Sequence, residues 1–448
     1  MDHTRRTIDD TQWTGRKAPQ ESGDGQIPVN LSRISGVRKA IQDIPPDLKL
    51  CGVPGKSLLD VSDPLLTYIW AVLRNESPLC PEASPGEWDD LLSILASHWI
   101  IPALYWHTGS LPPECRPPEP ITDKIRKAFL IGCVQCLHME RQLGEIYEAF
   151  QAKGVPMLVL RGPGLGWSVY PDPAMRPGCD LDLLVLPEQV VQARGILEGL
   201  DYRCLGKRFE SGKDFYREEG FVHQRNPRDN LPVDLHWGYW ELHPFFESRL
   251  DLGIKDLFNR AWKVESSALT FDTLHPVDAL IHEVIHLAMI HKGDMRLIWI
   301  YDTALLARRI EIPDDWEALQ ERSVFWRARL ALEHALKMAE VWFGLQLPDG
   351  FNDFSKWPRA TDEESMIWSH VMRHHWATFL FKRSLSSPSG LLKLLRSLFR
   401  LLFPNPDMVR FCYPVSHNWF LPLSYFRRWQ RWFRDLILNR IWSVKQQD

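Results

Sequence analysis

The segment from Val155 to Asp182 constrains the fold of this chain more than any other. It reads VPMLVLRGPGLGWSVYPDPAMRPGCDLD and begins with an apolar strand that ends at Arg161 and Gly162. A short helical stretch follows, and a second strand then carries Asp180 and Asp182. Because side chains alternate between the two faces of a strand, these two carboxylates lie on the same face. The segment therefore predicts a strand, a helix and a strand that presents paired acidic groups.

Paired carboxylates on one face repel each other, and a cleft that exposes them favours a divalent cation. The sequence LPVDLHW predicts a third strand, from Pro232 to His236, that brings Asp234 beside Asp180 and Asp182. Three carboxylates of this kind hold Mg²⁺ or Mn²⁺ against nucleotide phosphates. The pattern indicates phosphoryl or nucleotidyl transfer.

At these residues the chain resembles a family of bacterial nucleotidyltransferase-like proteins in the DNA polymerase β superfamily. The similarity covers roughly residues 125 to 310, and its segments are LRG at 160–162, YP at 170–171, R at 176, DLDLLV at 180–185, VDLHW at 233–237 and HLAMIHKGDMRLIWIYD at 286–302. The resemblance implies that Asp180, Asp182 and Asp234 are catalytic and bind the metal ions, while Gly162 contacts the triphosphate. It also implies transfer of a nucleoside monophosphate to an acceptor hydroxyl or amine, with ATP as the default donor and pyrophosphate as the product.

Two features of the turn differ from the superfamily pattern. Gly162 is followed by Pro163 where a second Gly or Ser is usual, and proline removes one backbone donor that could face a phosphate. Arg161 stands where relatives tend to carry Lys, so the positive charge is kept on a planar group. Arg176 is a second candidate for phosphate contact because a guanidinium pairs with two oxygens. The altered turn favours, as an alternative, a protein that binds a nucleotide without catalysis.

Four polar residues are candidates for contact with the acceptor. His236 follows Asp234 by two positions and so shares its strand face, where it would orient Asp234 or touch substrate. His286, Arg296 and Asp302 lie on predicted helices beside the sheet; the alternative interpretation is a core histidine and an ordinary ion pair. The sequence does not identify the acceptor, and a small molecule, a peptide, a sugar and tRNA all stay open.

A competing pattern is HEVIH at residues 282–286, which matches the HExxH motif of zinc hydrolases on a predicted helix, with Glu283 as the base. No third zinc ligand is evident, and Met289 and Lys292 stand where the extended motif needs Gly and His. The DxD of some glycosyltransferases is a weaker alternative, because little α/β sequence precedes Asp180. A CxxC at Cys133 and Cys136 lies in a predicted helix and has no second CxxC to complete a zinc site.

The predicted fold class is α+β: a small mixed sheet flanked by a helical N-terminal region and a large helical C-terminal region. The predicted domains are a disordered leader (1–55), an N-terminal helical region (56–154), a nucleotidyltransferase core (155–270) and a C-terminal helical domain (271–448). Six strands are predicted, at Met157–Leu160, Leu181–Leu186, Tyr202–Leu205, Phe215–Arg217, Gly220–Gln224 and Pro232–His236, with one helix from Pro187 to Gly199.

The composition is ordinary for a globular protein, with 45% hydrophobic residues and a net charge of −4, so it gives no global reason to bind nucleic acid or membrane. No signal-peptide core and no long apolar run is present, which predicts a cytoplasmic protein without a transmembrane span. From Leu391 to Asp448, ten Lys and Arg stand against three Asp, a local charge of +7. This basic, aromatic tail is expected to cap the domain, or else to touch a membrane surface or a partner.

Overall fold

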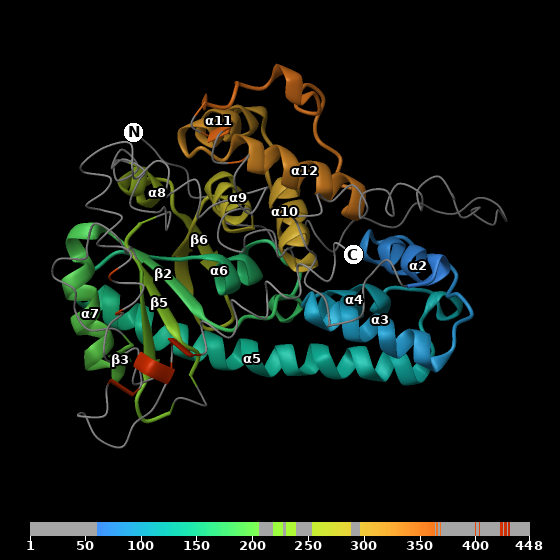
Figure 1. The fold of residues 1–448 in the computed structure, drawn as a ribbon, viewed down its shortest axis with the longest axis horizontal. Helices are drawn as coiled ribbons and strands as arrows, with labels where there is room; N and C mark the ends of the chain where they lie inside the picture. The colour runs from blue at the N-terminus through green and yellow to red at the C-terminus, as the bar shows by residue number, and fades with distance from the viewer. Residues whose placement is uncertain are drawn as a thin grey trace.

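The computed structural model describes residues 61–205, 218–226, 230–238, 253–287 and 296–362, together with a few single positions nearer the C-terminus. The predicted leader, the predicted strand at 215–217 and most of the basic tail lie outside these residues. The described part has an α+β fold in which a twisted mixed sheet is packed between helices (Figure 1). The predicted fold class is therefore confirmed, while the domain boundaries stay a prediction.

The sheet has seven strands in the described residues, in the order β3-β4-β5-β2-β1-β7-β6. The strands are β1 Met157–Val159, β2 Leu181–Val185, β3 Tyr202–Cys204, β4 Glu218–His223, β5 Val233–His236, β6 Trp262–Glu265 and β7 Thr270–Thr273. At its centre β2 pairs antiparallel with β1 and parallel with β5. Five of the predicted strands are found within two residues of their expected ends.

The hairpin of β6 and β7 was not predicted and is a correction to the expected core. Its strands pair antiparallel with each other, and β7 pairs parallel with β1 through Val159 and Thr273. Val264 and Phe271 are buried, while their neighbours Lys263 and Glu265 are exposed. This is the alternation of a half-buried strand, but each strand has only four residues, which is too short for a firm periodic signal.

The two faces of the sheet have different roles. Leu181 and Leu183 of β2 point into an apolar cluster with α5 (Glu119–Ala152) and α7 (Val190–Gly199). In Figure 1, α5 runs beneath the sheet and continues past it under α3 and α4. Asp182 lies between these leucines and so belongs to the opposite face. Polar groups on that face are covered by other helices, and this is where the candidate site forms.

The N-terminal helices are α2 (Asp63–Leu73), α3 (Pro85–Ser97) and α4 (Ile101–Gly109), followed by α5. Ser84 and Glu87 form a capping box that satisfies the first backbone donors of α3 and so defines its start. Cys133 and Cys136 lie on α5 as free thiols. The long helix thus connects the helical region to the sheet.

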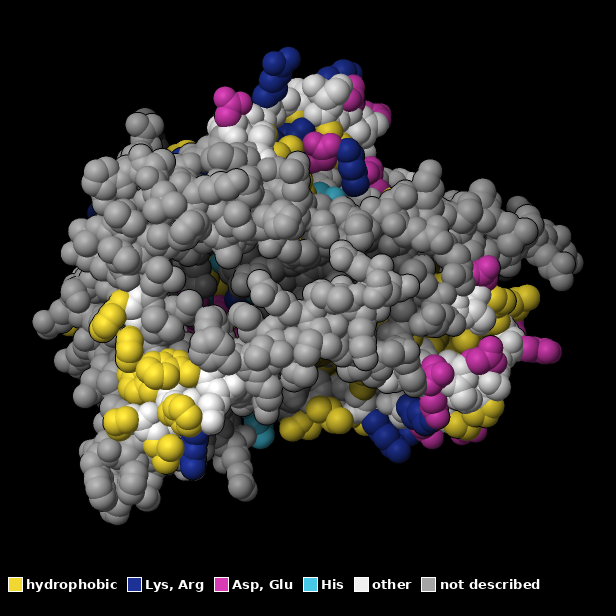
Figure 2. Space-filling model, in the orientation of Figure 1, with side chains coloured by type: hydrophobic (Ala, Val, Ile, Leu, Met, Phe, Trp, Pro, Cys, Tyr) yellow, Lys and Arg dark blue, Asp and Glu magenta, His cyan; other side chains and the backbone are white. Residues whose placement is uncertain are grey.

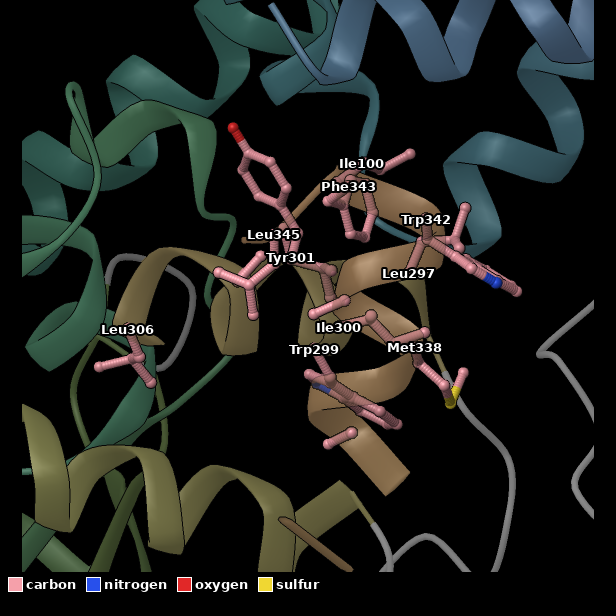
Figure 3. Close-up of a cluster of buried hydrophobic side chains, with 14 of the residues drawn as sticks. Ile100, Leu297, Trp299, Ile300, Tyr301, Leu306, Met338, Trp342, Phe343 and Leu345 are labelled. Atoms are coloured by element: carbon pink, nitrogen blue, oxygen red, sulfur yellow. The ribbon is translucent and has the colours of Figure 1, made fainter. Parts of the chain in front are cut away.

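The C-terminal helices are α8 (Ile254–Asn259), α9 (Pro276–Ile285), α10 (Leu297–Arg309), α11 (Pro313–Phe325) and α12 (Arg329–Phe343). Figure 3 shows the buried cluster where Trp299, Ile300 and Tyr301 of α10 meet Met338 and Trp342 of α12. Large aromatic side chains bury much apolar area at such helix interfaces, which accounts for many of the chain's tryptophans. None of the helices in the described residues combines the length and apolarity needed to cross a bilayer.

Candidate active site

Three carboxylates share one face at the centre of the sheet, and we call Asp180, Asp182 and Asp234 the carboxylate cluster. The parallel register of β2 and β5 pairs Asp182 directly with Asp234. Neighbouring strands lie about 4.8 Å apart, so side chains on the same face at paired positions are neighbours. Asp180 precedes β2 and shares the face of Asp182 by the two-residue period. The structure thus brings together the three acidic residues that the sequence singled out.

The protonation of the cluster reflects crowding of negative charge. Burial, and then the charge of Asp182, raise the pKa of Asp234 to about 6. The same two causes raise the pKa of Asp180. Gly220 on β4 is the register partner of Asp234, and a Cβ there would lie 3.2 Å from the Asp234 Oδ1 atom. The absence of a side chain at Gly220 therefore leaves room for the Asp234 carboxylate.

Asp182 is the buried member of the cluster and is held by two cationic partners. Arg161 donates to its Oδ2 atom at 2.9 Å, and the Nε2 atom of His236 lies 2.9 Å from its Oδ1 atom. Burial alone would raise the pKa of Asp182, but Arg161 and His236 hold it well below the ordinary value. His236 in turn has a raised pKa, because its bond to Asp182 outweighs its burial. His236 therefore contacts a carboxylate of the cluster, Asp182 rather than the expected Asp234.

The turn between β1 and α6 (Arg161–Ser168) places Arg161 beside this carboxylate. Arg161 has φ of 26°, a strained backbone for a residue with a side chain. Gly162 follows with φ 9° and ψ −101°, which interrupts the helix at its second residue. A Cβ on Gly164 would lie 2.7 Å from the Val159 carbonyl oxygen, so α6 packs closely on β1. Tight packing thus fixes the strained turn next to the cluster.

Arg176 and Asp302 form a buried ion pair. The Arg176 Nε atom lies 3.0 Å from both carboxylate oxygens of Asp302, and its Nη1 atom donates to the Pro177 carbonyl at 2.9 Å. The hydroxyl of Tyr170 also donates to Asp302. Both charged residues had been expected to contact substrate, and the structure places them in contact with each other. The pair joins α10 to the loop that leads into Asp180.

The HEVIH segment covers the carboxylate cluster from α9. His282 is buried, and its pKa lies well below the ordinary value because of burial and then the nearby charges of Arg161 and His236. His286, at the end of the helix, packs edge-on against Trp299 with ring centroids 5.3 Å apart. No third zinc ligand joins these residues, because the described part of the chain contains no group of three His, Cys, Asp or Glu side chains placed to hold a metal.

Glu283 was predicted only as the base of a zinc site, and the structure gives it a different environment. Its side chain is 0% exposed, and neither carboxylate oxygen has a hydrogen-bond partner. Burial, and then the charge of Asp302, raise its pKa to about 8. The charges of Arg176, Arg161 and Asp182 also act on it. Nothing in the sequence pattern marks Glu283 as a neighbour of Arg161, since their proximity depends on how α9 packs over the sheet.

Arg296 is held between two indole rings. Its guanidinium carbon lies 4.0 Å from the ring centre of Trp99 and 5.3 Å from that of Trp299. Its Nε atom is buried without a hydrogen-bond partner. Trp99 has φ of 59°, which is unusual for a bulky side chain. Because Trp299 also packs on His286, a continuous row of side chains leads from the HEVIH segment to Arg296.

The donor chemistry of the carboxylate cluster fits a hard divalent cation. Its groups offer oxygen ligands, which Mg²⁺ and Mn²⁺ prefer, and a cation would relieve the repulsion that raises the pKa values of Asp180 and Asp234. In the described residues the oxygens of the three carboxylates are not arranged around a common point where a metal ion could bind all three. Asp182 contacts Arg161 and His236. A metal ion that binds Asp182 would therefore have to replace at least one of these two contacts.

In Figure 2 a few acidic, basic and histidine side chains are visible in the region where Figure 1 places β2 and α6. A mixed sheet that carries in-register carboxylates next to a strand, turn and helix unit is consistent with a nucleotidyltransferase core. The chain belongs to a family of uncharacterised nucleotidyltransferases, whose model matches residues 84–344. This membership supports nucleotidyl transfer as the general activity.

Comparison with solved structures finds the solution structure of the antibiotic-resistance factor ANT(2'')-Ia. The two proteins are 14% identical, with a TM-score of 0.30, over 43% of this chain and 94% of that one. None of the curated proteins matches the chain.

Proposed function

We propose that the protein transfers a nucleoside monophosphate from a nucleoside triphosphate to an acceptor hydroxyl or amine. The acceptor atom attacks the α-phosphorus, the bond to the β-phosphate oxygen breaks, pyrophosphate leaves, and the acceptor proton passes to a base. Family membership supports the reaction class. The observation that carries the proposal for this chain is the direct register pairing of Asp182 with Asp234 next to Asp180.

A divalent cation, Mg²⁺ or Mn²⁺, held by Asp180, Asp182 and Asp234 would neutralise phosphate charge and lower the pKa of the acceptor. Asp234 is the preferred general base among the three. Its pKa of about 6 leaves it ionised at neutral pH but a stronger base than an ordinary aspartate. Arg161, next to Gly162 in the turn, is suited to pair with the phosphates once it is released from Asp182.

We assign Arg176 and Asp302 to positioning. Their buried pair fixes the loop before Asp180, and Arg176 would act on the phosphates through its charge rather than by direct contact. His236 is likewise assigned to positioning, because its contact with Asp182 orients that carboxylate.

Arg296 is the preferred contact for the acceptor, with His286 beside it through Trp299. Stacking on Trp99 and Trp299 holds the guanidinium in place without using its hydrogen-bond donors. The Nε atom has no hydrogen-bond partner among the described residues, and it is the donor that we assign to an anionic or polar group of the acceptor. His286 would help to orient Trp299 in this arrangement.

A second candidate function is nucleotide binding without catalysis. Two observations favour it: Pro163 lacks the backbone donor that a second Gly or Ser would supply, and Asp182 is held by Arg161 and His236. A zinc hydrolase gains no such support from the described residues.

A thermal-unfolding titration tests the proposal without knowledge of the acceptor. Each of the four nucleoside triphosphates is added with and without Mg²⁺ to the wild type and to an Asp180→Asn/Asp182→Asn variant. We expect a Mg²⁺-dependent rise in Tm with at least one triphosphate, lost in the variant and kept in Asp89→Asn, which changes an exposed carboxylate. Binding without pyrophosphate release across a broad acceptor set would favour the second candidate, and no binding at all would refute both.

A further inference from the structure

Glu283 is a buried carboxylate that has no hydrogen-bond partner. Both of its oxygens are unpaired, although its side chain is 0% exposed. An unpaired buried polar group costs free energy, and native proteins leave few of them. The side chain therefore requires an explanation beyond core packing.

The group best able to pair with Glu283 is Arg161. The Arg161 Nε atom is also buried without a partner, and Glu283 is the carboxylate that acts most strongly on its charge after Asp182. The other nearby guanidinium, Arg176, is already engaged, since it donates to Asp302 and to the carbonyl of Pro177. A buried guanidinium and a buried carboxyl, which keeps its proton at neutral pH in the metal-free state, thus each have unused hydrogen-bonding capacity.

The carboxylate of Asp182 cannot keep its present contact with the Arg161 guanidinium and also bind a divalent cation through the same oxygen. Its Oδ2 atom accepts from Arg161, and its Oδ1 atom contacts His236. A cation that binds the carboxylate cluster repels the positive charge of Arg161 and competes for the same oxygens. A buried arginine that loses its carboxylate needs another, because an unpaired charge in the interior is strongly unfavourable.

We propose that Glu283 is a positioning residue that receives the Arg161 guanidinium when a divalent cation takes its place at Asp182. This inference rests on the proposed metal site at the carboxylate cluster. In the metal-free state Arg161 neutralises Asp182, and in the loaded state it pairs with Glu283 and turns its remaining donors toward the phosphates. Because Glu283 lies on α9, this helix would supply the new partner of Arg161 when the metal binds. The HEVIH segment would then have a role that does not involve zinc.

Direct titration with Mg²⁺ alone tests this exchange by isothermal calorimetry. The wild type is compared with Glu283→Gln, which keeps the shape of the side chain but cannot become negative. Glu364→Gln is the matched control, because Glu364 is also a buried glutamate with an unpaired oxygen and contacts the backbone of Leu330 instead. We expect the Kd for Mg²⁺ to rise about tenfold in Glu283→Gln and to stay at the wild-type value in the control.

A double-variant cycle with Arg161→Gln separates the exchange from a general effect on packing. Without the guanidinium there is no charge for Glu283 to receive, so Glu283→Gln should no longer change the Mg²⁺ affinity. Glu283→Asp, which keeps the charge, should bind Mg²⁺ more tightly than Glu283→Gln does. If Glu283→Gln is poorly folded, the comparison of Glu283→Asp with the wild type and the Arg161 Nε–H resonance on Mg²⁺ addition decide the matter.

The outcomes separate the two hypotheses. Equal Mg²⁺ affinity in the wild type and folded Glu283→Gln, or an Arg161 Nε–H resonance that does not respond to Mg²⁺, would overturn the exchange and leave the proposed function standing. A wild type that binds no Mg²⁺, with or without nucleotide, would overturn both.

Discussion

Arg176 and Asp302 are 126 residues apart in the chain, yet the Arg176 Nε atom lies 3.0 Å from each oxygen of the Asp302 carboxylate. Both side chains are almost completely shielded from solvent. Removing one partner of such a pair leaves an uncompensated buried charge. The pair therefore fixes the position of the loop that leads to Asp180, and it should be sensitive to truncation.

Asp302→Ala should lower the free energy of unfolding by about 3–5 kcal/mol, because Arg176 would stay buried without its counter-charge. Urea unfolding measures this change. The matched control is Asp123→Ala, which breaks an exposed pair with Arg126 and should change the free energy by less than about 1 kcal/mol. Equal effects of the two substitutions would show that the buried pair does not hold the fold.

Gly220→Ala should weaken Mg²⁺-dependent nucleotide binding about tenfold, because the added methyl group would lie against the Asp234 carboxylate. The protein should stay folded, since the contact involves a side-chain oxygen that can move. Gly195→Ala serves as the control, because a Cβ at this position of α7 meets nothing within 4 Å. Unchanged nucleotide affinity in Gly220→Ala would argue against a direct role for Asp234.

The stability of the metal-free protein should depend on pH through Glu283. Burial raises its folded pKa to about 8, so the folded state keeps a proton that the unfolded state loses near pH 4.5. The contribution to stability is fully present below the unfolded pKa and is lost as pH rises through the folded pKa, at up to about 1.4 kcal/mol per pH unit. Glu283→Gln should remove this dependence, so urea unfolding should show the variant gaining on the wild type between pH 5 and pH 8. If the unfolding free energies of the wild type and Glu283→Gln changed with pH in the same way, Glu283 would not be the group responsible.

Arg296→Ala should leave the affinity for nucleoside triphosphate unchanged and raise the KM for the acceptor. Its guanidinium is stacked on Trp99 and Trp299, neither of which belongs to the turn that is proposed to bind phosphate. Arg296→Lys should restore the charge but not the stacked planar group, and so should recover little of the acceptor affinity. Steady-state kinetics after an acceptor screen measure both parameters. A loss of nucleotide affinity instead would place Arg296 at the donor side.

The sequence predicted the central strands well because their physical signals are local. Leu181 and Leu183 alternate with Asp182 along β2, and Asp234 alternates with Val233 and Leu235 along β5. The hairpin of β6 and β7 was missed because its strands are short and half exposed. Periodicity shows which face a side chain occupies, but it does not show which distant element covers that face.

The same limit applies to the candidate site. The three carboxylates could be grouped from strand periodicity and resemblance, whereas the partner of Arg176 and the surroundings of Glu283 could not. Arg176 is predicted from the sequence to contact phosphate, and nothing in the sequence indicates that it also pairs with Asp302, because this pair depends on the packing of α10 against the loop before β2. The charge of Arg161 acts on Glu283 only because α9 packs over the sheet. These contacts follow from tertiary packing, which a short motif does not encode.

A crystal structure with Mn²⁺ and a non-hydrolysable nucleoside triphosphate tests the proposed metal site directly, because anomalous scattering locates the metal. We expect Mn²⁺ to be bound by Asp180, Asp182 and Asp234, with the triphosphate next to Arg161 and Gly162. Mn²⁺ bound instead at His282 and His286, or a triphosphate bound far from Asp182, would contradict this expectation.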